Sequence, residues 1–248
     1  AAAQTRAALA AGCQSVVCIG GGGPICEAAG ELCHTGATFY VVPGGTGNDF
    51  ARAFHLPKNP MAAFEAQLTG EAVEIDCGRM NGQSFLNVSG SGFDVAVLQK
   101  TEELKAVYPG EKAYRKAVLS VLERYKAFEV DVSIDGGAET HEACTIVEIA
   151  NGQSIGGGMR VAPDAKLDDG YFDVVVVKKV PRMLIPLLLP AFMLGWHTKI
   201  GLARVVRAKN VTMHAKGMIV NLDGKLLRVD EAKYEILPGA IRMKKPSA

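Results

Sequence analysis

The stretch PGGTGNDFAR, residues 43–52, is the part of this chain that best indicates its fold. It follows a short run of β-branched and aromatic residues, TFYVV at 38–42, and precedes a predicted helix that has Asn48 or Asp49 as its cap. Its three glycines permit positive φ angles and close approach of a ligand, and free amides at a helix N-terminus favour an anion. The stretch therefore predicts a nucleotide-phosphate site. An ordinary glycine-rich turn is the alternative, because glycine spacing alone does not separate the two.

A second glycine loop of the same kind lies upstream. Residues 15–19, SVVCI, have the apolar character of a buried strand, residues 20–23 are all glycine, and Pro24 is predicted to open a helix that runs to about His34. Two successive units of strand, loop and helix predict an α/β layer with parallel strands, whose loops meet at the carboxyl edge of the sheet. Ligands bind at that edge, so we expect both loops to contribute to one site.

The composition is that of a folded protein with no general affinity for nucleic acid. The chain has 248 residues, of which 48% are hydrophobic and 21% charged, and a net charge of +1 without interleaved basic and aromatic residues. The six cysteines form no CxxC pair and lie mostly in apolar runs, which predicts reduced, buried thiols in a cytosolic protein rather than a metal–thiolate site. The longest apolar run, 184–194, contains two prolines and is too short to span a bilayer.

The pattern of elements changes near residue 70. Helices and strands alternate before it, whereas short strands predominate after it, predicted at 73–77, 84–88, 130–134, 144–150 and 172–177. One long helix is predicted in this second part, at 111–126. We place the boundary near Ala72. An α/β nucleotide domain normally begins with a strand and this chain begins with a predicted helix, so we expect residues preceding Ala1 to contribute a first strand.

Four ordered motifs resemble the bacterial diacylglycerol kinases and sphingosine kinase-like lipid kinases, whose superfamily includes the NAD kinases and 6-phosphofructokinases. They are PGGTGNDFAR at 43–52, NVSGSGFDVAV at 87–97, NGQSIGGGMRVAPDAKLDDGYFDVVVV at 151–177 and LDGK at 222–225. The resemblance implies an α/β nucleotide-binding domain followed by a mostly β, sandwich-like domain, with the ATP cleft between them. The domains expected are 1–71 for the α/β part, 72–236 for the lipid-substrate part, and 237–248 returning to the first.

The activity implied by the resemblance is transfer of the γ-phosphate of ATP, with Mg²⁺, to the hydroxyl of diacylglycerol or a related lipid. Asp223 matches the acid of the family's DGE motif and would be the general base, and Asp94 lies where the family contacts the head of its lipid. The implied nucleotide-binding residues are Gly20, Gly21, Gly22, Gly23, Gly45, Thr46, Gly47, Asn48 and Asp49. The family's structural magnesium loop corresponds to the carbonyls of Lys166 and Tyr171 and the carboxylate of Asp169.

Each of these roles has a simpler alternative. Asp49, which the family would use to hold magnesium through water, also has the position of a helix cap, and Asp223 precedes a glycine as in a plain turn. Asp169 likewise precedes a glycine and suits a metal-free turn, while Asp94 suits the capping of a turn. The glycines at 156–158 either bring the backbone close to the cleft or form a bulge in a strand.

The chain departs from the family at positions that carry chemistry. The family's first loop is GGDGT followed two residues later by Glu, and alignment on Glu27 places Gly22 where the Asp belongs and Pro24 where the Thr belongs. The third residue of the DGE motif, on which some assignments place the base, is Lys225 here. Glycine and proline supply neither charge nor hydroxyl, so a second hypothesis is a nucleotide- or lipid-binding relative with impaired catalysis. A third, an NAD kinase, does not account for LDDGYFDVVVV at 167–177.

The apolar segment MLIPLLLPAFMLGW at 183–196 is predicted to be a core helix, with a lip for acyl chains or a bilayer as the lesser alternative. The expected partner is a lipid substrate at a membrane surface, without nucleic acid and without a transmembrane segment, and a homodimer is left open. The expected location is the cytoplasm, with peripheral contact to the inner membrane surface. Which lipid is the acceptor depends on the shape of the cleft and is not predicted.

Overall fold

The computed structural model describes residues 1–108 and 111–246. Its helices are α1 (Ala2–Ala10), α2 (Gly22–Leu32), α3 (Asp49–Ala53), α4 (Pro60–Leu68), α5 (Phe93–Lys105), α6 (Glu111–Arg124) and α7 (Ile185–Met193), with short 3₁₀ turns η1 (Arg182–Leu184) and η2 (Trp196–Thr198). Its strands are β1 (Ser15–Gly20), β2 (Thr38–Pro43), β3 (Glu71–Met80), β4 (Gln83–Phe85), β5 (Val88–Gly92), β6 (Phe128–Ile134), β7 (Thr140–Ala150), β8 (Phe172–Lys178), β9 (Ala203–Ala208), β10 (Asn210–Leu222) and β11 (Lys225–Lys245).

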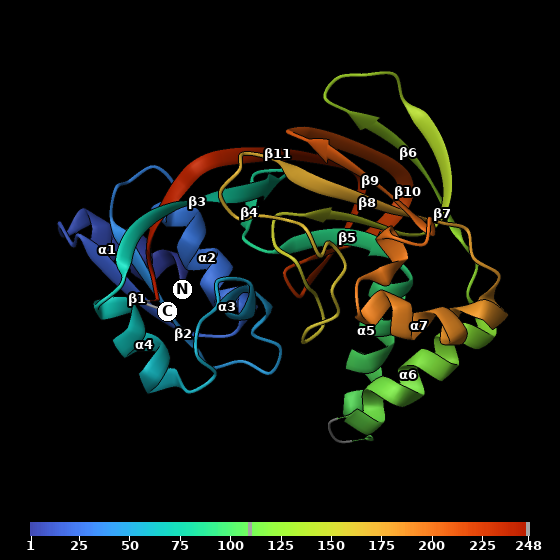
Figure 1. Cartoon of the computed structure of the whole chain (residues 1–248), viewed down its shortest axis with the longest axis horizontal. Helices are drawn as coiled ribbons and strands as arrows, with labels where there is room; N and C mark the ends of the chain where they lie inside the picture. The colour runs from blue at the N-terminus through green and yellow to red at the C-terminus, as the bar shows by residue number, and fades with distance from the viewer. Residues whose placement is uncertain (109–110, 247–248) are drawn as a thin grey trace.

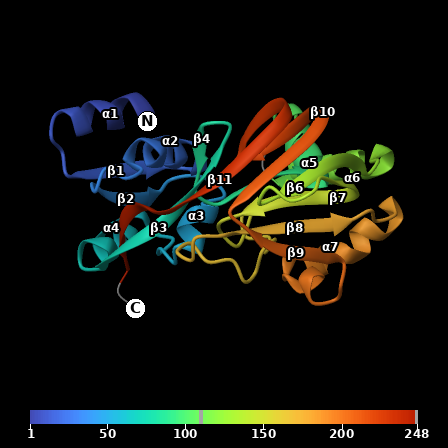
Figure 2. The same cartoon turned by 90° about the horizontal axis from the view of Figure 1, so that it is seen from above.

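The strands join in one sheet that extends through both halves of the molecule (Figure 1). β1 pairs in parallel with β2, and β2 in parallel with the end of β11, whereas the remaining pairs are antiparallel. β11 is the strand that connects the halves, because its start pairs with β10, its later part with β3, and its Arg242 with Thr38 of β2. Figure 2 shows β11 and β3 running side by side between the two halves. The division at 1–71, 72–236 and 237–248 stays a prediction.

The sequence located most elements but missed one helix that matters for the site. α5 begins directly after Gly92 within the NVSGSGFDVAV motif, so the expectation of a single long helix after residue 72 is wrong. The glycines before it and the β-branched residues within it obscure the helical period. α2 was expected to begin at Pro24 and instead begins at Gly22. The predicted strands are present with different ends, and the segment expected at 84–88 is divided between β4 and β5.

The core has three clusters of buried side chains. One fills the α/β half around Leu32 and Phe39, and a second lies on one face of the β-rich half around Phe85 and Phe172. The third lies on the opposite face, between the sheet and helices α5–α7, around residues such as Phe93. Figure 1 shows these three helices gathered on one side of that half of the sheet. The candidate site extends into this third region.

All six cysteines are free thiols, and four of them are buried, as the apolar context of their sequence positions predicts. Within residues 1–108 and 111–246, no helix combines the length and the apolar character needed to cross a membrane.

Candidate functional site

The first glycine loop leads into the N-terminus of α2. Gly21 is the N-cap and offers no side chain, and the helix begins at Gly22. The first amides of a helix have no partner within the helix, so the N–H groups of Gly22 and Gly23 can face an anion in the field of the helix dipole. Pro24 lies within the first turn and contributes no N–H group. These residues line a cavity of about 700 Å³. The loop therefore offers two amides to a ligand in that cavity.

The two glycine loops lie in direct backbone contact. The amide of Gly44 donates to the carbonyl of Gly20 at 2.9 Å, which extends the parallel pairing of β1 and β2 into the loops. A Cβ atom on Gly45 would lie only 2.5 Å from the Cα atom of Gly21. Real Cβ atoms do not approach backbone so closely, so glycine at position 45 is required by packing between the loops. The glycines of this site thus serve the assembly of the loops as well as access for a ligand.

The second loop is closed by its own asparagine. Asn48 accepts from the amide of Gly45 at 2.9 Å and donates to the carbonyl of the same residue at 2.7 Å. It adopts a left-handed conformation with φ of 50° and caps α3 without a side-chain capping bond. Asn48 therefore shapes the loop, and it lines the cavity together with Thr46 and Gly47.

Asp49 links the second loop to the opposite side of the cleft. Its two carboxylate oxygens accept from the amide of Gly157 at 3.0 and 2.9 Å. Burial raises the pKa of Asp49, and the Gly157 amide opposes that shift. The glycines at 156–158, each with a positive φ angle, bring their backbone to the loop in this way. A role for Asp49 in holding magnesium stays a prediction.

The carboxylate of Asp223 is already surrounded by donors. Its Oδ2 accepts from the amides of Leu86 and Asn87, at 2.7 and 3.1 Å, and from the thiol of Cys26 at 2.8 Å, and its Oδ1 accepts from the amide of Val88 at 2.9 Å. Burial raises the pKa of Asp223, which these donors oppose. A carboxylate with several amide donors is a strong anchor between chain segments. Its use as a general base, which stays a prediction, would require one donor to give way to the acceptor hydroxyl.

Two of the three departures from the family pattern, Gly22 and Lys225, lie beside the turn that carries this carboxylate. A Cβ on Gly22 would approach the carbonyl oxygen of Asp223 to 2.9 Å, so the Asp223 turn occupies space next to the first loop. Lys225 follows the turn, lines the cavity, and donates from Nζ to Oε1 of Gln83 at 2.9 Å. The site therefore presents a lysine ammonium where the family's carboxylate belongs.

Asp94, which lines the cavity, shares a side-chain hydrogen bond with the buried Glu148, which the sequence did not single out. Asp94 lies in the first turn of α5, and Glu148 lies on β7, on the same face as Ile146. The Oδ1 atom of Asp94 and both oxygens of Glu148 are buried and have no other partner among residues 1–108 and 111–246. Two charged carboxylates cannot donate to each other, so the contact requires a shared proton. The N-terminus of α5 favours the charge on Asp94, and Glu148 is then the donor.

Replacing Glu148 with glutamine should remove a pH dependence from the stability of the fold. Burial raises the pKa of both carboxyls, that of Glu148 well above its ordinary 4.5, so above pH 4.5 the folded protein retains a proton that the unfolded chain loses. The free energy of unfolding should therefore fall with rising pH, by about 1.4 kcal/mol per pH unit for one proton, until the folded pKa is passed. Urea unfolding at a series of pH values measures this slope.

The wild-type slope should be steeper than that of Glu148→Gln by this amount, and the exposed Glu139→Gln serves as a matched control. Equal slopes for wild type and Glu148→Gln would show that no proton is shared between Asp94 and Glu148.

The loop expected to hold structural magnesium is occupied by a salt bridge. Asp169 Oδ2 lies 2.6 Å from Nη2 of Arg207, and its Oδ1 accepts from the amide of Tyr171 at 3.2 Å. Arg207 therefore neutralises the carboxylate that the predicted set of Lys166, Asp169 and Tyr171 would offer to a metal. Within the described ranges no cluster of three or more His, Cys, Asp or Glu side chains is suited to a metal ion. The carbonyl ligands of the predicted set stay a prediction.

Sequence reasoning also passed over Asp76, which organises the neighbourhood of this loop. This buried residue on β3 accepts from the amide of Gly170 at 2.7 Å and from that of Gly239 on β11 at 2.8 Å. Asp76 thereby fixes the loop to β11. Its one sequence signal is a carboxylate within an apolar strand.

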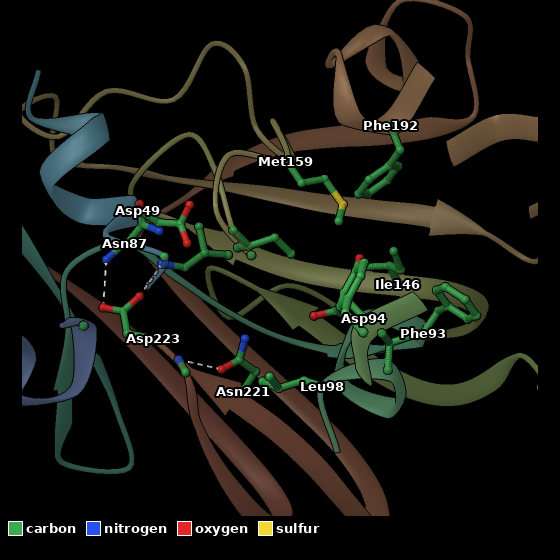
Figure 3. A pocket seen from close by; sticks show the side chains of 18 of the residues that line it. Asp49, Asn87, Phe93, Asp94, Leu98, Ile146, Met159, Phe192, Asn221 and Asp223 are labelled. Atoms are coloured by element: carbon green, nitrogen blue, oxygen red, sulfur yellow. Dashed lines mark hydrogen bonds between the residues drawn. The ribbon is translucent and has the colours of Figure 1, made fainter. Parts of the chain in front are cut away.

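One cavity joins the glycine loops and Asp223 to the apolar region around Asp94. Figure 3 shows Asp49, Asn87 and Asp223 at one end and Phe93, Asp94, Ile146 and Phe192 at the other. The first end is bounded by the glycine loops, and the second by apolar side chains from α5, α6, β7 and α7. A ligand with a polyanionic group and an acceptor with a long apolar body could occupy the two ends of the same cavity.

Two family models match the chain. The diacylglycerol kinase catalytic domain matches residues 1–80, and the YegS C-terminal NAD kinase beta sandwich-like domain matches residues 87–245. A diacylglycerol kinase of Mycobacterium tuberculosis is 30% identical over 246 residues, covering 97% of this chain and 79% of that protein. A Pseudomonas aeruginosa protein named probable lipid kinase YegS-like is 35% identical, with the same shares covered.

Solved structures agree on the fold. A diacylglycerol kinase of Bacillus anthracis superposes with a TM-score of 0.71 at 23% identity, covering 97% of this chain and 80% of that one. An NAD kinase of Archaeoglobus fulgidus, solved in complex with ATP, gives a TM-score of 0.50 at 15% identity, covering 94% and 78%. The expected α/β domain followed by a mostly β, sandwich-like domain is confirmed.

Proposed function

Since the chain belongs to the family of bacterial diacylglycerol kinases and YegS-like lipid kinases, we propose that it phosphorylates the hydroxyl of diacylglycerol or a related lipid. Kinase activity and the use of ATP are properties of that family. The observation that supports this acceptor is that one cavity of about 700 Å³ runs from the glycine loops to an end lined by apolar side chains.

In the proposed reaction, ATP supplies an electrophilic γ-phosphate. The amides of Gly22 and Gly23 and the loop around Thr46 would hold its phosphates, and Asp49 is the candidate to orient Mg²⁺. Asp94, which lines the cavity, is the candidate to accept a hydrogen bond from a hydroxyl of the lipid head. Asp223 would receive the proton of the lipid hydroxyl while the hydroxyl oxygen attacks the γ-phosphorus and ADP leaves. Catalysis of this kind depends chiefly on positioning, which both ends of the cavity would supply.

The proposal is tested with the full protein, labelled ATP, Mg²⁺ and mixed micelles that contain diacylglycerol. Labelled phosphatidic acid should appear, and Asp94→Asn should raise the KM for the lipid more than it lowers kcat. The absence of product with any lipid hydroxyl, from protein whose folding is verified by thermal unfolding, would contradict it.

A second candidate function is a nucleotide- and lipid-binding relative with impaired turnover. The observations that favour it are Gly22, Pro24 and Lys225 at family positions that carry chemistry, and the four donors that already engage Asp223. This candidate predicts ATP binding with turnover that is slow relative to the family. Strong activity in the unmodified protein would reject it.

The place of action follows from the two substrates. ATP and reduced thiols are cytoplasmic, and a diacylglycerol-like acceptor resides in a membrane, so we infer a cytoplasmic protein in peripheral contact with the inner membrane surface. A homodimer stays an untested prediction.

A further inference from the structure

The segment predicted to be a core helix carries an apolar surface. Ile185 and Phe192 of α7 are buried, but the core interpretation is wrong for the side chains on its other face and in the adjoining turns. We call this surface the α7 platform: Met183 (85% exposed), Leu184 (46%), Leu187 (75%), Met193 (52%), Leu194 (52%), Trp196 (56%) and Ile200 (56%). Single exposed apolar residues are ordinary on a protein surface, whereas a contiguous set in one segment indicates a binding surface.

The opposite face of α7 belongs to the substrate cavity. Ile185, Leu188, Leu189 and Phe192 line it, as does His197 of η2. α7 therefore forms a wall between the cavity and the surface, which explains why its sequence is apolar on all sides. A helix that separates a lipid cavity from solvent would be covered on its outer face by something apolar.

The charges around the platform indicate what covers it. Residues 178–209 contain seven basic residues and no Asp or Glu: Lys178, Lys179, Arg182, Lys199, Arg204, Arg207 and Lys209. Arg204 and Arg207 have carboxylate partners in Glu142 and Asp169. Exposed Lys178, Lys179, Arg182 and Lys199 flank the platform in sequence. An apolar face with a basic rim complements an anionic membrane, where apolar side chains enter the interface and basic ones meet lipid phosphates.

We propose that the α7 platform docks on an anionic lipid bilayer and inserts Met183, Leu187 and Trp196 into its interface. The cavity wall then lies at the surface where the acceptor lipid resides. The docking deepens the proposed function, because it says how the lipid end of the cavity approaches its substrate, but it does not depend on catalysis. Each basic residue near the surface contributes roughly a fivefold gain in affinity, so the rim and the apolar face should act together.

The fluorescence of Trp196, the single tryptophan of the chain, can report insertion into the bilayer. The full protein, without nucleotide, is mixed with phosphatidylcholine vesicles that contain or lack phosphatidylglycerol. With anionic vesicles we expect co-sedimentation, a blue shift of Trp196 emission, quenching by brominated lipids, and weakening at high salt. Vesicles of phosphatidylcholine alone should bind at least tenfold more weakly.

Leu187→Glu should reduce vesicle affinity at least tenfold. Met61→Glu, at a similarly exposed position on α4 in the other half of the molecule, is the matched control and should bind like wild type. Neither change alters a cavity residue, so both variants should phosphorylate a dispersed short-chain diacylglycerol at the wild-type rate. Thermal unfolding verifies that each variant is folded.

The outcomes separate docking from function. Vesicle binding by the wild type that is lost in Leu187→Glu supports docking through the α7 platform. If the same protein phosphorylates no lipid, only the proposed function fails. Unchanged Trp196 emission with no co-sedimentation overturns the docking. A blue shift that depends on protein concentration in the absence of vesicles, with dimers in sedimentation velocity, would assign the platform to a second copy and overturn it as well.

Discussion

Gly45→Ala is expected to lower the affinity for ATP at least tenfold and to destabilise the fold by about 1–3 kcal/mol, the usual effect of forcing atoms into a packed site. The new Cβ would lie 2.5 Å from Cα of Gly21 and 3.0 Å from Oδ1 of Asn48, so it meets both the neighbouring loop and the side chain that closes its own loop. Backbone cannot yield as a flexible side chain does, and the two loops must separate. Isothermal titration with ATP and Mg²⁺, together with urea unfolding, measures both effects.

Gly23→Ala is the matched control in the same site. A Cβ at position 23 meets nothing within 4 Å, its φ is not positive, and alanine is favoured within α2. This variant should keep the stability of the wild type or exceed it, and it retains its amide. Similar losses of affinity in both variants would mean that any added methyl in the cavity disturbs ATP, and that contact between the loops is not the cause.

The difference between Gly45 and Gly23 shows which properties of the two loops the glycine pattern could predict. Two glycine loops after two strands were enough to predict their convergence at the sheet edge, because that follows from parallel strand order. The sequence did not show which glycines pack against the other loop and which face open space. Gly45 faces Gly21 and Gly23 faces open space, and this depends on the register of β1 against β2.

The parts of the site that sequence reasoning missed depend on contacts between distant residues. Asp94 was expected near the lipid head, but its partner Glu148 lies on another strand and is brought beneath it by the pairing of β5 with β7. Asp223 was expected to be the general base, but the sequence did not show that the paired β10 and β5 bring amides from 86–88 to its carboxylate. The apolar composition of the segment at 183–196 predicted a core helix, because a helix that walls a cavity and a helix within a core have the same composition.

Lys225→Glu is expected to raise kcat for lipid phosphorylation at least tenfold. The turn between β10 and β11 places position 225 at the cavity, directly after Asp223 and Gly224. A carboxylate there would not share the four donors of Asp223, and it could accept the proton of the acceptor hydroxyl. General base catalysis typically contributes about 10²–10⁴-fold, so even an imperfect placement should be measurable. The measurement is initial rates with labelled ATP and diacylglycerol micelles.

Lys225→Gln separates the two consequences of this change, because it removes the ammonium without adding a base. It also retains a polar partner for Gln83, to which Lys225 donates. A gain in Lys225→Glu that Lys225→Gln does not share would identify the missing carboxylate as the limit on turnover. Gly22→Asp is a poorer restoration, since its Cβ would press on the Asp223 carbonyl at 2.9 Å. If both Lys225 variants have the wild-type rate, the base lies elsewhere, and Asp223 must exchange one of its donors for the acceptor during each turnover.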